Sequence, residues 1–598
     1  MGTMSNKELA SLFSTIALYL EIEDVPFKPQ AYERAAGVLE TLQERVEDIY
    51  EREGVKGLDK ISGVGKGMAE KIEEYIKTGA IGEYEKLRKK IPIDIKELTR
   101  IEGVGPKMVR DLYKHLKIKT IADLEKAAKA GKVRKLPNFG ERTEQNILQG
   151  IEFVKRSKGR WLLGTIFPYV EVLLGKLEGS PFVTRAIAAG SIRRMKETVG
   201  DVDILITSEK PEKAIGYFLS VVSYEKIWGK GATKVSVRTR EGFDIDMRVL
   251  PEEVFGAGLQ YFTGSKEHNV RLRTYAASKG YKLSEYGLFR GKRRIVLQQS
   301  QDNSERSRRI ACATEEDVYR ALGMNYIEPE LREDHGEIDA ALRQAQGKLP
   351  GLPKVIPYGS LKGDLQVQTD WTDGKDSIEA MAREAKKQGL EYIAITDHTR
   401  DLAMTGGMDE KKLLSQMREI DKINEKFKAQ GEKFRVLKGA EVNIRKDGTL
   451  DITDEVLAKL DVVGISVHSN FKMPKKDMTA RIVKAMGNPH ADILFHPTGR
   501  LIAKREAYQV DMDEIIATAK KTGTILEINA FPERLDLADS NIKRAVEAGC
   551  KMAIDSDAHS ISHLGYLRYG VAQARRGWAE QQDIINSYPL KEMLSLLK

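Results

Sequence analysis

Apolar residues recur at helical spacing through the first quarter of the chain. Leu9, Leu12, Phe13, Ile16 and Leu20 are spaced so that they share one face of a helix. Patterning of the same kind continues to about residue 150. The N-terminal quarter is therefore predicted to be helical.

The pattern changes near residue 186. The segments AIAAGSIRRMKETVGDVDILITS (186–208) and GFDIDMRVL (242–250) have the apolar content and turn residues expected of strands. The stretch 328–359 is first charged and then rich in proline and glycine, which is typical of an interdomain linker. A mixed α+β region is therefore predicted between the helical quarter and the linker.

Beyond the linker, short strand-like runs alternate with helical stretches. The runs are 392–396, 462–467, 493–495, 524–528 and 551–554. This alternation is typical of parallel strands connected by helices. It predicts an α/β barrel or an open α/β sheet.

The length of 598 residues indicates several domains, because one hydrophobic core does not serve so long a chain. Lysine and arginine number 98 against 89 acidic residues, and the resulting charge of +9 favours a polyanionic partner such as nucleic acid. The two cysteines, Cys312 and Cys550, fit a reducing compartment better than a disulfide framework. The sequence has no apolar run of about 18 residues, so we expect a cytoplasmic protein that does not enter a membrane. We also expect a monomer.

An internal repeat in the helical quarter carries paired glycines. ISGVGKGMAEKI (61–72) and IEGVGPKMVRDL (101–112) each place Gly-Val-Gly before a helix. The glycines allow a tight turn whose backbone N–H groups point outward at a helix N-terminus, where a phosphate can bind. The alternative is an ordinary turn. Two copies in a basic chain favour DNA binding, and they resemble helix-hairpin-helix motifs; the glycines are Gly63, Gly65, Gly103 and Gly105.

Two acidic residues share one face of a predicted strand. Asp201 and Asp203 are two positions apart, and the strand period of two places them side by side. A divalent cation would relieve their repulsion, and a third carboxylate would complete a two-metal site for phosphoryl transfer. Spacing alone leaves Asp244 and Asp246 as equal candidates for the third position. The alternative is a solvated acidic strand edge.

The surrounding residues resemble the nucleotidyltransferase signature of family X DNA polymerases, similar to polymerase beta. The resemblance rests on Gly190-Ser191, Arg194 and Gly200, and on YFTGSKEHNVRLR (261–273), and it covers roughly residues 1–325. It aligns IDMRVLP so that Asp246 is the third carboxylate.

This resemblance implies a role for each matching residue. Asp201 and Asp203 would hold both metal ions, Mg²⁺ or Mn²⁺, while Asp246 completes the catalytic metal site near the primer 3′-hydroxyl. The substrates would be deoxynucleoside triphosphates and gapped or primer-template DNA. Ordinary core packing is the alternative for Tyr261 and Phe262. The implied nucleotide-binding residues are Gly190, Ser191, Arg194, Gly200, Tyr261, Phe262, Gly264, Asn269 and Arg273.

The same resemblance identifies Lys71 as a candidate for the Schiff-base lysine of a deoxyribose-phosphate lyase. Lys28, Tyr32 and Arg34 lie in the matching pocket segment. A surface lysine is the alternative. Two lysine-like positions of the family are Gly67 and Glu83 here, which makes the expected pocket less basic.

Polar residues gather at the predicted strand ends of the C-terminal half. They occur in GDLQVQTDWTDG, ITDHT, GAEVNI, ISVHSNF, LFHPTGR and DSDAH. Active-site residues of α/β barrels lie at such ends, and this combination of histidines and carboxylates indicates a metal centre. The set is His398, Glu441, His468, His496, Asp557 and His559.

This half resembles the PHP domain, a distorted (β/α)7 barrel that in family X polymerases uses a three-metal cluster, with Zn²⁺ or Mn²⁺, for 3′-to-5′ exonuclease activity. The resemblance implies seven matching metal-binding positions, which are Asp373 and the six residues above. The first two histidines of that family are Gln366 and Gln368 here. A carboxamide is a weak ligand for these ions, so we expect loss of one metal and absent or weakened hydrolysis, with the barrel binding or orienting DNA. The alternative is a remodelled site that is active with Mn²⁺.

Together the two resemblances imply a prokaryotic family X polymerase that fills short gaps in base-excision repair. A hydrolase whose polymerase part delivers DNA ends, and a non-enzymatic scaffold, are the alternatives. The expected domains are a DNA-binding helical domain at 1–90, a helix-hairpin-helix subdomain at 91–155, a palm at 156–260, a thumb at 261–326, a linker at 327–357 and a PHP domain at 358–598.

Overall fold

The computed structural model describes residues 6–290 and 309–598, except positions 24, 43, 44, 62, 100, 102, 103, 138, 157, 158, 311, 403 and 404. The chain divides into two compact units. The first is Met1–Lys158 with Ala503–Arg505, and the second is Gly159–Ile502 with Glu506–Lys598. Each unit is described by itself.

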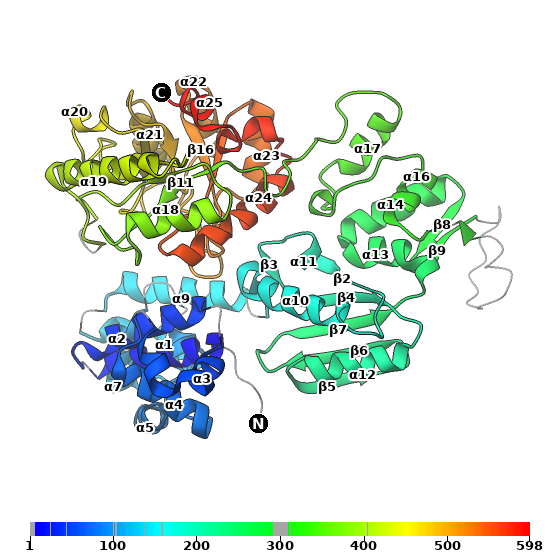
Figure 1. Cartoon of the computed structure of the whole chain (residues 1–598), viewed down its shortest axis with the longest axis horizontal. Coiled ribbons are helices and arrows are strands. Elements are labelled where there is room, and N and C mark those ends of the chain that lie inside the picture. The colour runs from blue at the N-terminus through cyan, green and yellow to red at the C-terminus, as the bar shows by residue number, and fades with distance from the viewer. Residues whose placement is uncertain are drawn as a thin grey trace. The chain divides into compact units, whose positions relative to one another are not determined.

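The N-terminal unit is helical, as the periodicity predicts, and its described residues contain no strand (Figure 1). On α1, Leu9, Phe13, Ile16 and Leu20 are buried and pack against α2, where Tyr32 meets the ring of Phe13 edge-on. The elements are α1 (Asn6–Ile22), α2 (Lys28–Thr41), α3 (Val46–Asp59), α4 (Lys66–Thr78), α5 (Gly82–Lys90), α6 (Ile95–Leu98), α7 (Pro106–Leu116), α8 (Ile121–Lys129), η1 (Val133–Lys135) and α9 (Glu141–Arg156).

A five-stranded sheet follows, in the order β2-β4-β7-β6-β5, and we call this region the palm. β4 and β7 are parallel, and the other pairs are antiparallel. Apolar residues of α10 and α12 share one core with the sheet. The elements are β1 (Trp161–Leu162), α10 (Leu163–Glu178), β2 (Arg185–Ala188), α11 (Gly190–Arg193), β3 (Thr198–Val199), β4 (Asp201–Thr207), α12 (Pro211–Val221), β5 (Tyr224–Lys230), β6 (Lys234–Thr239) and β7 (Asp244–Val249).

The next segment, the thumb, packs around a small antiparallel sheet of order β10-β9-β8. The predicted linker is partly folded: Arg332 is buried, and Leu331, Ile338 and Val355 belong to the thumb core. The elements are η2 (Glu252–Val254), α13 (Phe255–Thr263), α14 (Lys266–Ser278), β8 (Tyr281–Ser284), β9 (Gly287–Arg290), β10 (Arg309–Ile310), α16 (Glu315–Ala321), η3 (Pro329–Leu331) and α17 (Glu337–Ala345).

The C-terminal region contains seven parallel strands in sequential order, from β11 to β17. All residues of β11, β12 and β14 to β17 are buried, as in parallel sheets covered on both faces. A parallel bridge between Val367 and Ala558 brings the two edges together. Of the two architectures predicted for this region, the structure is therefore the barrel, nearly closed.

The strands of this barrel are β11 (Gly363–Val367), β12 (Tyr392–Ile395), β13 (Arg435–Asn443), β14 (Val462–Ser466), β15 (Ile493–Leu494), β16 (Ile525–Asn529) and β17 (Met552–Asp555). Its α-helices are α18 (Ile378–Lys387), α19 (Glu410–Ala429), α20 (Asp454–Leu457), α21 (Lys475–Met486), α22 (Met512–Thr522), α23 (Asp539–Ala548), α24 (Leu567–Arg576) and α25 (Leu590–Leu594). Short 3-10 turns are η5 (Ile561–Tyr566), η6 (Gln581–Asp583) and η7 (Ile585–Ser587). Within the described residues, no helix has the length and apolarity needed to span a membrane.

Candidate functional sites

The palm sheet places two acidic strands side by side. The register of β4 and β7 pairs Asp201 with Asp244 and Asp203 with Asp246. Because side chains alternate along a strand, these four carboxylates belong to one face of the sheet.

Asp244 is engaged by neighbouring strands. Arg238 donates to its two carboxylate oxygens over 2.6 and 2.8 Å, and the indole of Trp228 donates over 2.8 Å. Partial burial opposes its ionisation, but these hydrogen bonds outweigh burial and lower the pKa of Asp244. Asp246 is therefore the better candidate for the third carboxylate.

The ionised form of Asp203 is electrostatically unfavourable in the metal-free palm. Burial, followed by the charges of Asp201 and Asp246, raises the pKa of Asp203 to about 7. Lys234 Nζ lies 2.9 Å from an oxygen of Asp246 and neutralises part of this charge. Oxygen ligands with excess negative charge fit Mg²⁺ or Mn²⁺.

A cleft of about 820 Å³ opens beside Asp201 and Asp203. All the predicted nucleotide-binding residues except Gly200 line it. Sequence analysis missed Arg160, Lys196 and Glu333, since nothing in their spacing distinguishes them from surface charges. The predicted residues in the lining are Gly190, Ser191, Arg194, Tyr261, Phe262, Gly264, Asn269 and Arg273.

Glycine is required where α11 meets the carboxylates. Gly190 has φ +63°, and a Cβ there would lie 2.7 Å from Asp203 Oδ2. Gly200 lies outside the cleft lining, but a Cβ there would be 3.4 Å from the guanidinium of Arg160. Gly190 therefore allows the backbone to approach Asp203 closely, whereas the space at Gly200 does not require glycine.

The cleft holds Arg194 in a defined position. Its Nε donates to Glu333 over 3.0 Å, and its Nη1 donates to the carbonyl of Thr263. Asn269 is similarly fixed, because it donates to the carbonyl of Tyr261 over 2.6 Å and accepts from Gln260 over 2.8 Å. These side chains are positioned before any ligand arrives.

The repeated glycine turns have matching geometry in the helical unit. Gly65 and Gly105 are the N-caps of α4 and α7, with extended φ and ψ and no capping side chain. In both turns the following backbone N–H groups are presented at a helix N-terminus, which favours a phosphate. Gly63 has φ +86°, whereas Gly103 lies outside the described residues.

The candidate lyase lysine has an acidic partner. Lys71 Nζ donates to Glu74 over 2.8 Å. Glu83 accepts from Lys28 over 3.3 Å and from Tyr32 over 2.8 Å, so an acid occupies the pocket segment beside the expected basic residues. This arrangement weakens the case for a lyase.

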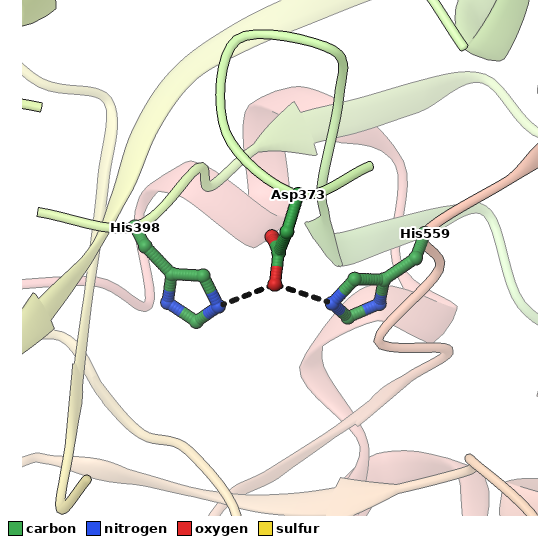
Figure 2. A group of neighbouring side chains, drawn as sticks. All are labelled: Asp373, His398 and His559. Atoms are coloured by element: carbon green, nitrogen blue, oxygen red, sulfur yellow. Dashed lines mark ion pairs between the residues drawn. The ribbon is translucent and has the colours of Figure 1, made fainter. Parts of the chain in front are cut away.

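In the barrel, the predicted metal-binding residues do meet. Figure 2 shows Asp373 between His398 and His559, each with a ring nitrogen 3.7 Å from Asp373 Oδ2. The ligand atoms of these three residues lie within 4.8 Å of one another. Burial opposes protonation of His559, but Asp373 and Asp557 outweigh it and raise its pKa to about 9. This donor set fits Zn²⁺ or Mn²⁺.

Glu441 is the centre of a second group. His468 and His496 place Nε2 atoms 3.0 and 2.9 Å from its Oε1, and His398 Nδ1 lies 3.5 Å from its Oε2. Burial opposes the charge of Glu441, but the three histidines outweigh it and hold its pKa well below the usual range. His398, Glu441 and His468 form the second compact ligand set among the described residues.

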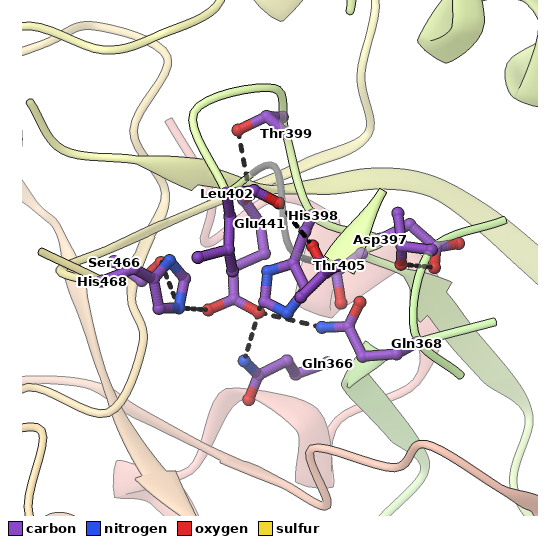
Figure 3. A network of polar contacts seen from close by, with 12 residues as sticks. Gln366, Gln368, Asp397, His398, Thr399, Leu402, Thr405, Glu441, Ser466 and His468 are labelled. Atoms are coloured by element: carbon purple, nitrogen blue, oxygen red, sulfur yellow. Dashed lines mark hydrogen bonds and ion pairs between the residues drawn. The ribbon is translucent and has the colours of Figure 1, made fainter. Parts of the chain in front are cut away.

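The two glutamines close one side of Glu441. Gln366 and Gln368 are fully buried, and their amide groups donate to Glu441 Oε2 over 3.2 and 2.9 Å (Figure 3). Amide donors, and not ligand lone pairs, therefore face this carboxylate. Gln366 also accepts from Asn529 over 3.1 Å.

Asp557 also lies on this side, where it meets a cation that the motifs did not indicate. Arg534 Nε lies 3.1 Å from Asp557 Oδ2, and Asn529 donates to the same oxygen over 3.2 Å. Burial opposes its charge, but Arg534 and His559 outweigh burial and lower the pKa of Asp557. The barrel thus keeps two ligand sets of histidine and carboxylate groups. The remaining contacts of Glu441 and Asp557 are made by the two glutamines, Asn529 and Arg534.

Comparison with known proteins finds four family models. These are a helix-hairpin-helix domain at residues 4–81, a SAM-like helix-hairpin-helix tandem at 95–152, a DNA polymerase beta thumb at 258–333 and a PHP domain at 364–531.

Two curated relatives and one solved structure are similar to parts or all of this chain. The DNA polymerase/3′-5′ exonuclease PolX of Bacillus subtilis is 35% identical over 598 residues, covering 100% of both chains. A probable phosphatase of Thermoanaerobacter sp. is 31% identical over 35% of this chain and 84% of its own. A solved polymerase beta complex of Leishmania infantum covers 40% of this chain and 97% of its own, with 25% identity and a TM-score of 0.26.

The acidic palm and the histidine-rich barrel give the chain two candidate metal-binding centres. Because similarity extends over the full length of the Bacillus subtilis relative, the chain belongs to the family X DNA polymerases with a C-terminal PHP domain, the PolX family.

Proposed function

We propose that this family X polymerase fills short gaps in DNA during base-excision repair in the prokaryotic cytoplasm. Its substrates would be deoxynucleoside triphosphates and gapped or primer-template DNA, and the working form would be a monomer. The observation that carries the proposal is the electrostatically strained Asp203, flanked by Asp201 and Asp246, beside a cleft with several cationic side chains.

In this proposal the palm carboxylates form the catalytic centre. Mg²⁺ or Mn²⁺ bound there would neutralise charge on the triphosphate and stabilise the negative charge that develops on the primer 3′-oxygen. Asp201 and Asp203 would hold both ions, and Asp246 would face the hydroxyl. Asp244 stays with Arg238 and Trp228, so it has a supporting role outside the reaction.

The cleft residues would orient the incoming nucleotide. Ser191 and Arg194, with Arg160 and Lys196 nearby, offer donors to the triphosphate. Tyr261 and Asn269 lie on the same cleft and suit contacts with the sugar and base. Catalysis of this kind depends on positioning and on charge neutralisation more than on a protein nucleophile.

The helical unit would bind the DNA backbone through its two glycine turns. The N-termini of α4 and α7 offer backbone donors without a competing capping side chain. Such contacts fix a protein on DNA without reading sequence. Lyase activity at Lys71 is a weaker proposal, since Glu74 already accepts from its amine.

For the barrel we propose weak or absent hydrolysis. Gln366 and Gln368 direct donors at Glu441, so a cation at that position would lose two ligands and face amide hydrogens. The second candidate is a remodelled phosphoesterase that uses Mn²⁺, favoured by the compact Asp373, His398 and His559 set.

The test is single-nucleotide gap filling by matched variants. Asp203→Asn and Asp246→Asn should each lower kcat by at least roughly 1,000-fold, because each removes a ligand that acts on the transition state. Asp244→Asn should retain most of the activity. Equal loss in Asp244→Asn and Asp246→Asn would refute the assignment of the third carboxylate, and unchanged filling by Asp203→Asn would refute the palm centre.

A further inference from the structure

Arg576, at the end of α24 in the PHP barrel, contacts two residues that line the cleft of the palm, Arg194 and Glu333. Its side chain is only 3% exposed. The Nη1 atom donates to the main-chain carbonyl of Arg194 over 3.0 Å and to Glu333 over 3.0 Å. Its Nη2 atom donates to Asp539 on α23, which anchors the guanidinium in the barrel.

These contacts support Arg194 from two directions. Arg194 Nε donates to the same oxygen of Glu333 that receives Arg576, and Lys196 Nζ lies 3.3 Å from the other oxygen. Arg576 therefore holds both the backbone of Arg194 and the acid that aligns its guanidinium. Guanidinium groups suit such sites because their donors have a fixed planar geometry.

We propose that Arg576 is a positioning residue for nucleotide binding, through which the PHP barrel keeps Arg194 oriented toward the triphosphate. The inference rests on the proposed role of Arg194. It gives the barrel a function in the polymerase reaction that does not depend on hydrolysis.

The charges around Glu333 determine whether loss of Arg576 should raise or lower nucleotide affinity. Glu333 is nearly buried, and although burial opposes its ionisation, Arg576 and then Arg194 and Lys196 outweigh it and hold its pKa at about 2. Glu333 is thus a carboxylate that competes with the triphosphate for Arg194. Without Arg576, Glu333 would depend more on Arg194 and would repel the triphosphate more strongly, so nucleotide affinity should fall.

The neighbouring Arg575 provides a matched control. It also joins α24 to η3 of the thumb and to the segment before β11, donating to Glu330 over 2.8 Å and to the carbonyl of Ile356 over 3.0 Å. Among the described residues, its hydrogen-bond and ion-pair partners are Glu328, Glu330 and Ile356, and not Arg194 or Glu333. Arg575→Gln therefore removes a similar buried ion pair without touching the support of Arg194.

The experiment measures steady-state filling of a one-nucleotide gap by the full chain, with the DNA saturating and the triphosphate varied. We expect Arg576→Gln to raise KM for the triphosphate at least about 5-fold, the lower end of typical coupling between sites. The kcat and the Kd for gapped DNA should stay within about twofold, because the substitution weakens nucleotide binding equally in the ground state and the transition state. Arg575→Gln should change KM by less than about twofold.

Further variants separate positioning from misfolding. Arg576→Lys retains the charge but not the planar pair of contacts, so its KM should be intermediate. In a Glu333→Gln background, the effect of Arg576→Gln should shrink, because the competing carboxylate is absent. Equal KM values for Arg576→Gln and Arg575→Gln, or full activity of both, would overturn the inference.

Arg194→Gln distinguishes this inference from the function on which it rests. A higher KM in Arg194→Gln, together with equal KM values for the two α24 variants, would overturn the positioning role and leave the nucleotide site intact. An unchanged KM in Arg194→Gln would overturn the proposed role of Arg194 and this inference with it.

Discussion

Asp203→Asn should stabilise the metal-free protein while abolishing polymerisation. Burial and the neighbouring Asp201 and Asp246 raise the pKa of Asp203 from 3.8 to about 7. At about 1.36 kcal/mol for each pH unit between these values, ionising Asp203 costs the folded state on the order of 4 kcal/mol at pH 8. Asparagine carries no such charge and removes this cost.

The sign of the pH dependence follows from the raised pKa. Below pH 3.8 Asp203 is protonated in both folded and unfolded chains, so the substitution should have little electrostatic effect. The cost of ionisation grows as the pH rises and becomes constant above about 7. The advantage of Asp203→Asn should therefore be roughly 1–2 kcal/mol at pH 5 and about 4 kcal/mol at pH 8.

The assay is thermal unfolding in EDTA at pH 5 and pH 8. The midpoint of the transition that includes the palm should rise by several degrees at pH 8 and by less at pH 5. Saturating Mg²⁺ should reduce the difference, because a cation favours the ionised wild type. Asp244→Asn is the control: hydrogen bonds lower the pKa of Asp244, so its loss should destabilise the fold at pH 8. Destabilisation by Asp203→Asn, or a gain independent of pH, would refute the reasoning.

Three further predictions concern the other sites. Replacing Gln366 and Gln368 together with histidine should increase primer shortening in Mn²⁺ at least roughly 10-fold on a sequencing gel, since two nitrogen ligands return; no gain would show that another feature limits hydrolysis. Gly65→Asp and Gly105→Asp should each weaken gapped-DNA binding roughly 10-fold at low salt by repelling phosphate, without lowering the thermal midpoint, because a Cβ at either position meets nothing within 4 Å and aspartate is a good N-cap. Borohydride trapping on a 5′-deoxyribose phosphate should give no more adduct for the wild type than for Lys71→Ala, and strong Lys71-dependent trapping would contradict the weak lyase assignment.

Local patterns were sufficient to predict much of the architecture. The period of the apolar residues in α1 located its buried face, and short apolar runs located β12 and β14 to β17 within one or two residues. The resemblance to family X polymerases extended this to the palm and thumb. Strand period and motif spacing are good predictors here because they depend only on residues that are close together in the chain.

Long-range pairing limited the rest. Spacing could not separate Asp244 from Asp246, because contacts with Trp228 and Arg238 make the difference. The segment 327–357 resembles a linker by composition, yet Arg332 is buried in it and donates to Glu315 over 2.5 Å. A charged residue gives no sequence signal of burial when its partner is distant in the chain.

The contact between the PHP barrel and the palm could not be predicted from the sequence for the same reason. Arg576 and Glu333 are separated by 243 positions, and neither belongs to a recognised motif. Arg534, which meets Asp557 in the barrel, was also missed because its partner comes from another strand end. Only the folded arrangement brings these groups together.

The most direct test of the account uses a 5′-labelled primer on a one-nucleotide-gapped duplex, in Mg²⁺ or Mn²⁺, with and without deoxynucleoside triphosphates. We expect extension by one nucleotide, with little or no primer shortening in either metal. Strong shortening without nucleotides would contradict the assignment of Gln366 and Gln368 as disabling substitutions. Failure to extend the primer in either metal would contradict polymerisation by the palm.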